Sequence, residues 1–448
     1  MRAHRLLVPA VLALLLAGAS AAAKPSRAGV REVGATAPAT QIAFALNLTL
    51  DQKLLDHDIA LGRAPSSASA LGARYGVSLN DERRVVGVLE RHGISVVATY
   101  PQRTEVDARA SVGVLARFFG VPFRDYSDRN GDVFHAPSRE PAVPASLRPY
   151  VSGMVGLDTR SLALPAALPH GALRPDDAAL AYDVDPLHAQ GIDGHGLKIA
   201  IVSLEPFPPD QHETRDDVST FRGQFHASGP DPIDVKVDGG GTANDLSEDN
   251  LDLDVMSSIA PGAQIVNYEA AKSGSGEVDV FEKIVAAGDI KIASFSWGIC
   301  DSGLPSGFRD AVENALKLAV LRGITVFVAS GDSGSYDCQR NDFANHTLTV
   351  DFPSDSPQVV SVGGTLLSVT SDGDYLREAG WENTLSYGGG GGGVNLHDPA
   401  PSWQVANHVS ASHRALPDVS ASASSTSGWL VRDHGEWNAF GGTSAAAP

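Results

Sequence analysis

Apolar and polar positions follow a short-period pattern in the first third of the chain. Residues 42–49 alternate between large apolar and small or polar side chains, which predicts a strand with one buried face. Residues 80–93 carry apolar positions at helical spacing after a possible capping residue, Asn80, and residues 94–99 follow as a strand. A second amphipathic helix is predicted over residues 110–119. This succession indicates a small α+β unit of ferredoxin-like type.

The pattern changes in the second half, where apolar runs of strand length recur without alternation. Such runs predict strands buried on both faces, as in a parallel sheet. They cover residues 197–202, 264–268, 290–296, 324–329 and 359–362, and the clearest helix between them is predicted over residues 306–322. Strands that alternate with helices indicate an α/β domain with a mostly parallel sheet. Side chains at the carboxyl ends of its strands are the expected builders of a functional site.

These patterns divide the chain into four segments. Residues 1–23 are predicted to be a secretory signal, because two arginines precede a short apolar core and a run of small residues. A first domain is expected over residues 24–165, structured from about 42 to 158, then a linker or processing region over 166–178 and a second domain over 179–448. No apolar stretch is long enough to span a bilayer, so we expect a secreted, extracellular protein.

Composition narrows the possible partners. The 448 residues are 43% hydrophobic and 19% charged, which is typical of a globular protein. The formal net charge of −19 argues against nucleic acid or an anionic membrane as the main partner. An acidic protein is compatible with work at low pH, where many of its carboxylates are neutral.

The chain has two cysteines, Cys300 and Cys338. In an oxidising compartment a disulfide between them is the simplest outcome, and two free buried thiols are the alternative. No further thiols or nearby histidines complete a metal site with this pair.

A candidate nucleophile lies near the end of the chain. Residues 441–448 read Gly-Gly-Thr-Ser-Ala-Ala-Ala-Pro, in which two glycines permit a tight turn ahead of Ser444. The alanines suit the start of a buried helix that carries a nucleophile on its first turn. Thr-Ser before alanine is also an ordinary helix cap. A catalytic role for Ser444 therefore depends on groups elsewhere that could activate it.

Two candidate acids lie on a predicted helix over residues 245–259. The spacing of Glu248 and Asp252 places both carboxylates on one helix face, which apolar residues continue. Both are therefore expected to point inward. The alternative is a solvated acidic run near a helix N-terminus, and we adopt that interpretation for Asp245 and Asp249.

A third acid, Asp332, follows the predicted strand 324–329 in the tetrapeptide Gly-Asp-Ser-Gly. Chymotrypsin-like proteases carry the same tetrapeptide, which would make Ser333 the nucleophile. That class is all-β, whereas strands and helices alternate here. Taken alone, the tetrapeptide is best explained as a turn.

The six glycines at 388–393 raise the possibility of a phosphate-binding loop. No Lys-Ser or Lys-Thr follows them, so nucleotide binding is disfavoured. A closely packed or flexible backbone segment is the better interpretation.

In this order and spacing the motifs resemble the sedolisin family, the serine-carboxyl peptidases that are acid-acting relatives of subtilisin. The resemblance covers nearly the whole chain after the signal. Its motifs include Phe119-Gly120-Val121, Gly153-Met154-Val155-Gly156, Gly194-His195-Gly196, Ser294-Phe295-Ser296-Trp297-Gly298, Ser330-Gly331-Asp332, Pro417-Asp418-Val419-Ser420 and Gly442-Thr443-Ser444. It implies a subtilisin-like, mostly parallel sheet flanked by helices, preceded by a ferredoxin-like activation prodomain.

The resemblance assigns chemical roles. Ser444 would attack the peptide carbonyl, with Glu248 as general base and then acid and Asp252 holding Glu248 in place. Asp332 would donate a hydrogen bond from its protonated carboxyl to the oxyanion. An unperturbed aspartate titrates near about 3.9, so activity is expected in acid. The implied substrate-binding residues are Ser294, Phe295, Ser296, Trp297, Gly298 and Gly331.

The implied protein is a secreted, acid-acting endopeptidase, made as a self-processing zymogen whose prodomain serves as inhibitor and folding aid. Protein or peptide substrates, a monomeric state and no nucleic-acid or membrane partner are expected. The family's calcium site is built from segments well beyond the serine, so we expect its ligands beyond Pro448, no metal site within this chain, and a chain that is a fragment of a longer protein. Some relatives carry a glutamate where Ser203 stands, and we do not assign that role to Glu205.

Three alternatives stay open. A subtilisin-type Asp/His/Ser peptidase shares the Gly-Thr-Ser turn, but its His-Gly-Thr-His helix is absent and His195 precedes a strand. A tripeptidyl-peptidase would use the same residues to remove tripeptides. An inactive homologue that acts as an exported binding protein is the non-enzymatic alternative.

Overall fold

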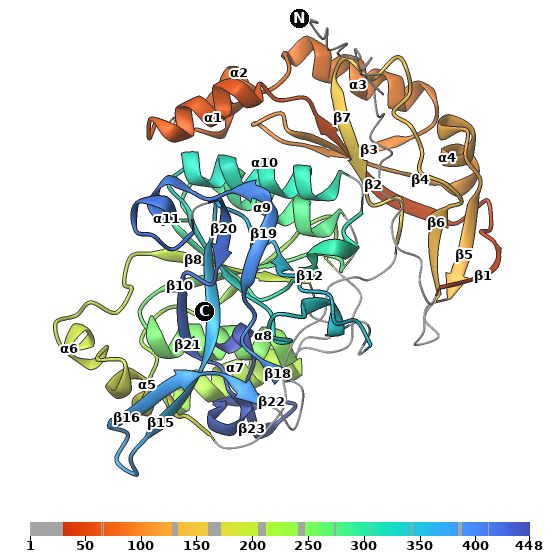
Figure 1. The fold of residues 1–448 in the computed structure, drawn as a ribbon. Coiled ribbons are helices and arrows are strands. Elements are labelled where there is room, and N and C mark those ends of the chain that lie inside the picture. The colour runs from red at the N-terminus through yellow and green to blue at the C-terminus, as the bar shows by residue number, and fades with distance from the viewer. Residues whose placement is uncertain are drawn as a thin grey trace, which may run out of the picture.

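The computed structural model contains two domains (Figure 1). It describes residues 30–63, 65, 67–127, 133–159, 172–204, 212–240, 247–272, 275–305, 307–340, 342, 344–383, 388–410 and 412–448. The predicted signal at 1–23 and most of the predicted linker lie outside these ranges. Among the helices described, none combines the length and the hydrophobicity needed to cross a bilayer.

The first domain is built on a four-stranded antiparallel sheet in the order β3-β4-β2-β7. Its strands are β2 (Gln41–Leu48), β3 (Ser95–Thr99), β4 (Glu105–Ser111) and β7 (Val151–Val155), and its helices are α1 (Gln52–Ala60), α2 (Ala68–Tyr75), α3 (Leu79–Arg91) and α4 (Val112–Phe119). A smaller sheet contains β1 (Arg31–Ala35), β5 (Phe123–Ser127) and β6 (Val133–Pro137). The strand order and the succession β2-α3-β3-β4-α4-β7 confirm the ferredoxin-like prediction.

Three details of the first domain differ from the prediction. Strand β1 (Arg31–Ala35) lies ahead of residue 42, where structure was expected to begin. Helix α3 begins after Ser78, whose hydroxyl accepts a hydrogen bond from the N–H of Asp81, so Ser78 and not Asn80 is the cap. Strand β4 has no counterpart among the predicted elements, because its charged residues hide the alternation expected of a strand. Glu105 and Asp107 are nevertheless buried, since the second domain covers them.

The second domain contains an eight-stranded sheet in the order β16-β15-β13-β11-β8-β10-β9, with β21 paired to β15. All neighbours are parallel except β15 and β16. The strands are β8 (Lys198–Ser203), β9 (Ile233–Lys236), β10 (Gln264–Glu269), β11 (Ile292–Phe295), β13 (Thr325–Ala329), β15 (Val360–Val369), β16 (Tyr375–Gly380) and β21 (Val419–Ser422). The five apolar runs are confirmed as strands of a mostly parallel sheet.

Helices cover both faces of this sheet (Figure 1). Helices α9 (Gly276–Ala287) and α10 (Phe308–Leu321) lie on the face toward the first domain, and α7 (His212–Gln224) and α8 (Ser247–Ile259) lie on the other. Strand β8 shows why its apolar residues do not alternate with polar ones. Ala200 and Val202 pack on the face covered by α9 and α10, while Ile199 and Ile201 pack on the face covered by α7 and α8.

Shorter elements complete the second domain. They are α5 (Pro175–Ala181), α6 (Asp185–His188), α11 (Ser402–Ala406), β12 (Ile299–Cys300), β14 (Asp351–Phe352), β17 (Glu382–Asn383), β18 (Gly388–Gly389), β19 (Gly393–Pro399), β20 (His413–Leu416), β22 (Trp429–Asp433) and β23 (Glu436–Phe440). Four 3₁₀ turns are described: η1 (Asp301–Gly303), η2 (Asp337–Arg340), η3 (Ser425–Ser427) and η4 (Thr443–Ala445).

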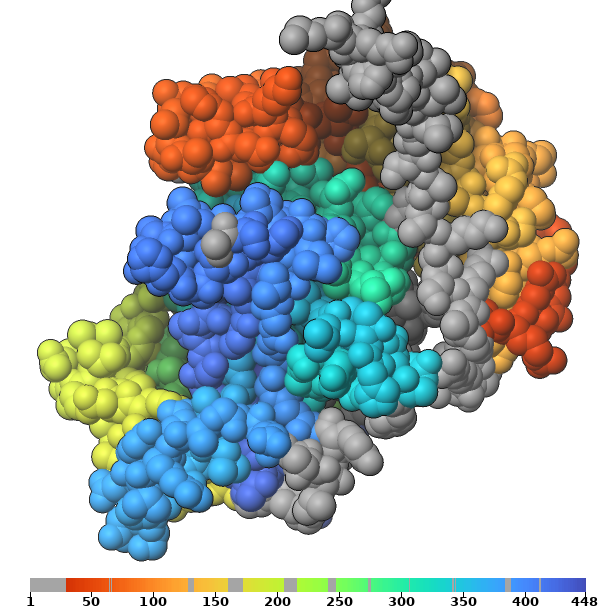
Figure 2. Space-filling model, in the orientation of Figure 1, coloured from red at the N-terminus to blue at the C-terminus, as the bar shows by residue number. Residues whose placement is uncertain are grey.

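The first domain rests on α9 and α10. Gln52 donates to the Asn314 side chain at 2.6 Å, and Lys317 pairs with Asp56 at 2.7 Å. Figure 2 shows the red-orange surface of α1 and α2 against the second domain. These polar contacts between helices α1 and α10 fix the edge of the interface.

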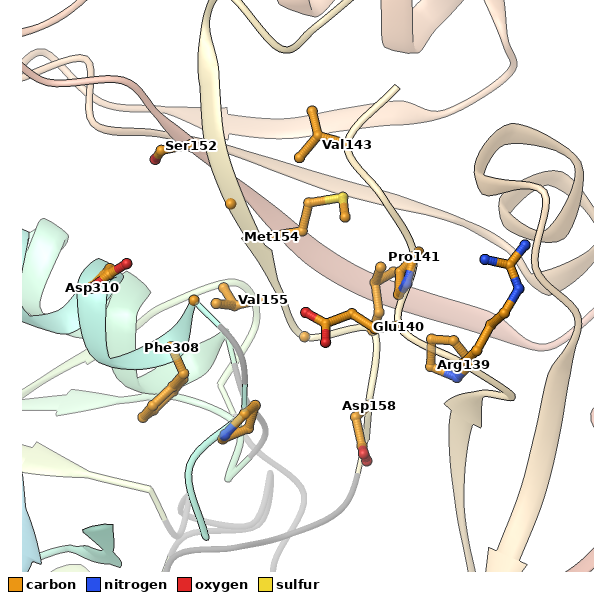
Figure 3. Close-up of a pocket in the computed structure, with 16 residues that line it drawn as sticks. Arg139, Glu140, Pro141, Val143, Ser152, Met154, Val155, Asp158, Phe308 and Asp310 are labelled. Carbon is orange, nitrogen blue, oxygen red and sulfur yellow. The ribbon is translucent and has the colours of Figure 1, made fainter. Parts of the chain in front are cut away.

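A cavity of about 310 Å³ lies in the same interface. Figure 3 shows Phe308 and Asp310 of α10 on one side and Met154, Val155 and Glu140 of the first domain on the other. None of the four predicted catalytic residues lines it. This cavity is therefore a gap between two docked domains, and the predicted catalytic residues lie outside it.

Candidate active site

Helix α8 carries the two inward-facing acids. Glu248 and Asp252 are 2% and 1% exposed, which confirms the predicted orientation of both side chains. The helix packs against strands β8 and β10 on one side and against η4 near the end of the chain. Its first turn is held by Asp433, whose carboxylate accepts hydrogen bonds from Ser247 and Asn250, both at 2.9 Å.

The solvated interpretation of Asp249 is wrong, because this residue is 1% exposed. Helix α7 and strand β22 cover the outer side of α8, so residues 248–257 are all buried. Asp254, on the same helix, accepts a hydrogen bond from the N–H of Arg432 in β22 at 2.9 Å. Asp245 lies outside the described residues.

Asp252 is linked to the end of β11. The Ser296 hydroxyl donates to Oδ1 of Asp252 at 2.8 Å and lies 3.4 Å from the carbonyl oxygen of Ser444. Burial raises the pKa of Asp252 well above its usual range, and the bond from Ser296 opposes this shift because it stabilises the ionised form. Ser296 thus connects Asp252 with the backbone of the candidate nucleophile, Ser444.

Asp332 lies just beyond β13 and contacts the turn that carries Ser444. Its Oδ1 accepts two hydrogen bonds from Thr443, one from the backbone N–H at 2.7 Å and one from the hydroxyl at 2.8 Å. The Thr443 hydroxyl in turn accepts from the N–H of Gly331 at 3.1 Å. Burial raises the pKa of Asp332, while these bonds and the charge of Arg340 act in the opposite direction.

Ser444 itself lies within the 3₁₀ turn η4 and is 1% exposed. Gly442, at φ 131°, brings the chain into this turn through a conformation that side-chain-bearing residues rarely adopt. The structure therefore brings Asp252, through Ser296, and Asp332, through Thr443, to the same short turn. Strands β11 and β13 are neighbours, so their carboxyl ends deliver both contacts to one edge of the sheet.

The glycine run packs against the segment that carries Asp332. Gly391 donates its N–H to the carbonyl of Gly331 at 2.7 Å, and Gly389 donates to the carbonyl of Asp332 at 2.9 Å. A Cβ at Gly391 would lie 1.9 Å from the carbonyl oxygen of Ser330. The expectation of a closely packed backbone is confirmed at this position.

The predicted substrate-binding segment is buried throughout. Phe295 packs in the main core with its ring 5.2 Å from that of Phe281, and Ser294 is 1% exposed. The Nζ of Lys272 lies 4.4 Å from the centroid of the Trp297 ring. Their predicted contacts with substrate stay predictions, as do those of Ser296, Gly298 and Gly331.

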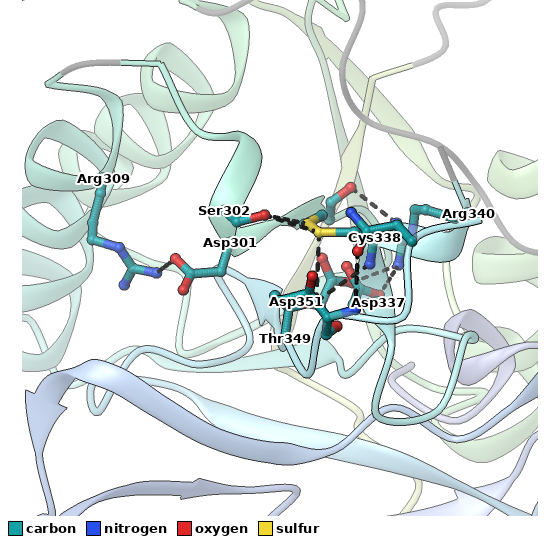
Figure 4. Close-up of a disulfide and its surroundings, with 12 residues drawn as sticks. Asp301, Ser302, Arg309, Asp337, Cys338, Arg340, Thr349 and Asp351 are labelled. Carbon is teal, nitrogen blue, oxygen red and sulfur yellow. Dashed lines mark hydrogen bonds and ion pairs between the residues drawn. A yellow bond between two sulfur atoms is a disulfide. The ribbon is translucent and has the colours of Figure 1, made fainter. Parts of the chain in front are cut away.

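The disulfide between Cys300 and Cys338 is present, as predicted, with Cα atoms 5.0 Å apart. It joins the segment after Gly298 to the segment after Asp332. Figure 4 shows the surrounding charged residues. Arg340 donates to the carbonyl of Gly298 at 3.0 Å and pairs with Asp351 at 2.8 Å.

Sequence reasoning missed Thr443, Arg340, Asp351 and Asp433, which hold the candidate residues in place. Thr443, Arg340 and Asp433 make contacts with residues far away along the chain, whereas Asp351 pairs with Arg340 only 11 residues away, and none of the four falls in a pattern of spacing that would indicate a role. Thr443 alone had a sequence signal, because it lies beside the candidate nucleophile and could have been considered as a partner of Asp332.

The structure places His195 away from this arrangement. It is exposed and lies in the loop that enters β8, whereas Asp332 and Ser296 lie at the carboxyl ends of the strands. It therefore does not occupy the position that a subtilisin-type histidine would need. Ser203 is fully buried at the end of β8, and Glu205 lies outside the described residues.

Comparison with known proteins adds two family matches. Residues 29–160 match the pro-kumamolisin activation domain, and residues 239–448 match the subtilase family. Kumamolisin from Bacillus sp. (strain MN-32) is 32% identical over 414 residues, which cover 85% of this chain and 72% of that protein. Sedolisin from Pseudomonas sp. (strain 101) is 28% identical, with 81% of this chain and 65% of that protein covered.

Xanthomonalisin from Xanthomonas sp. (strain T-22) is 27% identical over 84% of this chain. The matched part is 51% of xanthomonalisin, so the chain spans about half the length of this relative. Among solved structures, Pseudomonas sedolisin (serine-carboxyl proteinase) complexed with two molecules of pseudo-iodotyrostatin aligns with a TM-score of 0.54 and 24% identity. That alignment covers 63% of this chain and 78% of the sedolisin chain, and it supports the fold.

Proposed function

Because this chain belongs to the sedolisin family of serine-carboxyl peptidases, we propose that it is a secreted, acid-acting endopeptidase made as a self-processing precursor. The observation that carries the proposal is the bond pair between Asp332 and Thr443, which joins a half-buried acid to the turn that holds Ser444. Its reaction would be hydrolysis of a peptide bond through an acyl-enzyme on Ser444.

In the first step Ser444 attacks the carbonyl carbon and Glu248 accepts the hydroxyl proton. Asp252 holds Glu248 in place and is itself fixed by Ser296. The proton then passes from Glu248 to the leaving amine, and water repeats the sequence on the acyl-enzyme. The burial of Glu248 and Asp252 supports this assignment, because water-excluded carboxyls can share and release a proton near the working pH.

Asp332 supplies the oxyanion donor in this mechanism. Both bonds from Thr443 end on Oδ1, and Oδ2 makes no hydrogen bond with the described residues. The acidic proton is therefore assigned to Oδ2, where it can be donated to the developing oxyanion. A carboxyl donates only while neutral. Burial raises the pKa of Asp332 and so extends the acid range in which it can donate.

The first domain would act as prodomain, inhibitor and folding aid. Its match to an activation domain and its polar contacts with α10 support this role. We propose that processing cuts the chain within residues 162–174 and that the predicted signal directs secretion. For the calcium ion that the family resemblance implies, we keep the proposal that its ligands lie beyond Pro448, and no step above depends on it.

Incubation of the purified precursor near pH 4 tests the proposal. We expect self-cleavage within residues 162–174, which intact-mass measurement would detect. Cleavage should be lost in Ser444→Ala. Ser333→Ala is the matched control, because it removes the serine of the Gly-Asp-Ser-Gly turn and should leave cleavage intact. Unchanged processing in Ser444→Ala, or loss in Ser333→Ala alone, would exclude Ser444 as nucleophile.

The same material separates endopeptidase from tripeptidyl-peptidase action. Digestion of a denatured protein substrate with the processed enzyme should give fragments of many lengths if cleavage is internal. Release of tripeptides alone from the substrate N-terminus would replace the endopeptidase proposal and retain the catalytic residues.

A further inference from the structure

Three buried acids from both domains meet beneath the domain interface. Glu105 and Asp107 lie on β4 of the first domain, and Asp279 lies on α9 of the second. Their exposed fractions are 1%, 4% and 3%. Each offers a carboxylate oxygen, and these oxygens all lie within 4.8 Å of one another. The docked arrangement of the two domains therefore brings these three carboxylates together.

Several of these oxygens have no protein partner. Both carboxylate oxygens of Glu105 lack a hydrogen bond to any described residue, although the side chain is buried. Oδ1 of Asp107 and Oδ1 of Asp279 meet no N–H or O–H donor of another residue type, and the contacts of these two side chains are with carboxyl groups: Asp107 with Asp279, and Asp279 with Asp238. Oδ2 of Asp107 accepts from the Tyr100 hydroxyl at 2.8 Å. Unpaired buried carboxylate oxygens are costly, so this cluster requires a further neutralising group.

The described residues supply no cation to neutralise the cluster. No lysine or arginine among them forms an ion pair with Glu105, Asp107 or Asp279. Further acids add to the negative charge: Asp238, after β9, raises the pKa of Asp107 by repulsion, and Glu282 lies one turn along α9. Burial is the larger cause and raises the pKa of Asp107 to about 7.

We propose that Glu105, Asp107 and Asp279 bind a calcium-sized divalent cation that bridges the two domains. Calcium–oxygen distances of about 2.3–2.6 Å place any two ligand oxygens at most about 5 Å apart, which the observed spacing satisfies. Carboxylate oxygens without nitrogen or sulfur ligands favour a hard cation. Because the ligands come from β4 and α9, the ion would stabilise the docked precursor more than either domain alone.

Cation binding needs ionised carboxylates, so we expect the ion to bind at a pH where the three ligands are ionised. The other titratable groups packed against the cluster are Tyr100 from the first domain and Asp238 and Glu282 from the second. This inference concerns domain docking and does not depend on the proposed peptidase activity.

Terbium luminescence provides a direct probe, because Tb³⁺ replaces Ca²⁺ at oxygen sites and the ring of Tyr100 lies next to Asp107. The full chain carrying Ser444→Ala, stripped with a chelator at pH 8, should show tyrosine-sensitised Tb³⁺ emission that Ca²⁺ displaces. Glu105→Gln and Asp279→Asn should each weaken Ca²⁺ binding at least tenfold. Asp56→Asn is the matched control, because it removes an acid that pairs with Lys317 in the same interface but lies outside the cluster.

Two further measurements keep the test decisive if a cluster variant does not fold. Tyr100→Phe should abolish the emission while a Ca²⁺-dependent rise in melting temperature at pH 8 persists. Emission that survives in Tyr100→Phe, equal affinity in Glu105→Gln, or no Ca²⁺-dependent stabilisation of the parent precursor at pH 8 would overturn the proposal. The last outcome would mean that protons alone neutralise the cluster.

Discussion

Thr443 donates its backbone N–H to Oδ1 of Asp332 at 2.7 Å, across 111 residues of chain. The bond fixes the distance between the turn of the nucleophile and the end of β13. It also orients the Asp332 carboxyl, because the Thr443 hydroxyl donates to the same oxygen. Oδ1 thereby accepts both bonds from Thr443, and the proposed mechanism assigns the acidic proton to Oδ2.

Replacement of Asp332 tests the two roles assigned to its carboxyl, acceptance of the Thr443 bonds by one oxygen and proposed proton donation by the other. Asp332→Ala removes the oxyanion donor and the acceptor for Thr443, and we expect kcat to fall by about 10²–10³. Asp332→Asn keeps an acceptor oxygen for Thr443 and donates through its amide at every pH, so it should lose less. Activity of the parent enzyme falls as pH rises through the pKa of Asp332, because the ionised form cannot donate.

The pH profile of kcat is the deciding measurement for this pair of variants. In Asp332→Asn the decline on the alkaline side should move to higher pH, since the amide does not titrate. If kcat declines at the same alkaline pH in the parent enzyme and in Asp332→Asn, the titration of another group causes that decline.

Ser296 offers a second test, because its hydroxyl stabilises the ionised form of Asp252. Ser296→Ala should lower kcat/KM by about tenfold, corresponding to about 1.4 kcal/mol for one hydrogen bond to a charged group. Loss of the bond raises the pKa of Asp252 further. The lower apparent pKa of the coupled pair Glu248 and Asp252 should therefore also rise. The acid limb of the pH profile should therefore shift to higher pH.

Controls separate this effect from a general loss of packing. Ser296→Thr keeps a hydroxyl and should restore the acid limb. Ser257→Ala removes another buried serine of the same domain, one that accepts a hydrogen bond from Arg222 at 2.9 Å, and should leave the profile in place. A shift of similar size in Ser257→Ala would contradict the assigned role of Ser296.

The strands that build the site were predictable because both of their faces are apolar. Strand β13, for example, is one continuous run, and Asp332 follows its carboxyl end, where site residues are expected in a parallel sheet. Strand β4 was not predictable, because Glu105 and Asp107 lie where the second domain covers the sheet. Burial that depends on a distant partner leaves no alternation along the strand itself.

The same reasoning explains why Asp249 was assigned to the surface. Asp249 is covered by helix α7 and by strand β22, and β22 lies far along the chain. Its contact with α8, from Arg432 to Asp254, spans 178 residues. The positions of Glu248 and Asp252 on one face were predictable from helical spacing alone. The bond from Ser296 to Asp252, and the bonds from Ser247 and Asn250 to Asp433 that hold the first turn of the helix, arise from tertiary structure.

The prodomain contains an ion pair that should persist at the proposed working pH. Asp58, at the end of α1, accepts hydrogen bonds from Arg74 and from Tyr75 in α2, and the bond from Arg74 is the main reason that the pKa of Asp58 is lowered from 3.8 to about 2. A lowered pKa contributes stability that is fully present above about pH 4 and is lost as pH falls toward 2.

Asp58→Asn should therefore lower the melting temperature of the Ser444→Ala precursor at pH 5 and have little effect at pH 2. Thermal unfolding at the two pH values measures this difference. Asp56→Asn, on the same helix, is the control, because Asp56 is exposed and its ion pair with Lys317 should contribute less. An equal loss at both pH values would mean that Asp58 acts through packing and not through its charge.

Gly391 provides a test of the backbone behind Asp332. A methyl group at this position would lie 1.9 Å from the carbonyl oxygen of Ser330, so Gly391→Ala must displace either the glycine run or the segment that carries Asp332. We expect kcat to fall at least tenfold, since a misplacement of about 1 Å can cost about 10² in rate. Gly380→Ala is the matched control, because nothing lies within 4 Å of a Cβ there. Full activity in Gly391→Ala would show that the position of Asp332 does not depend on the glycine run.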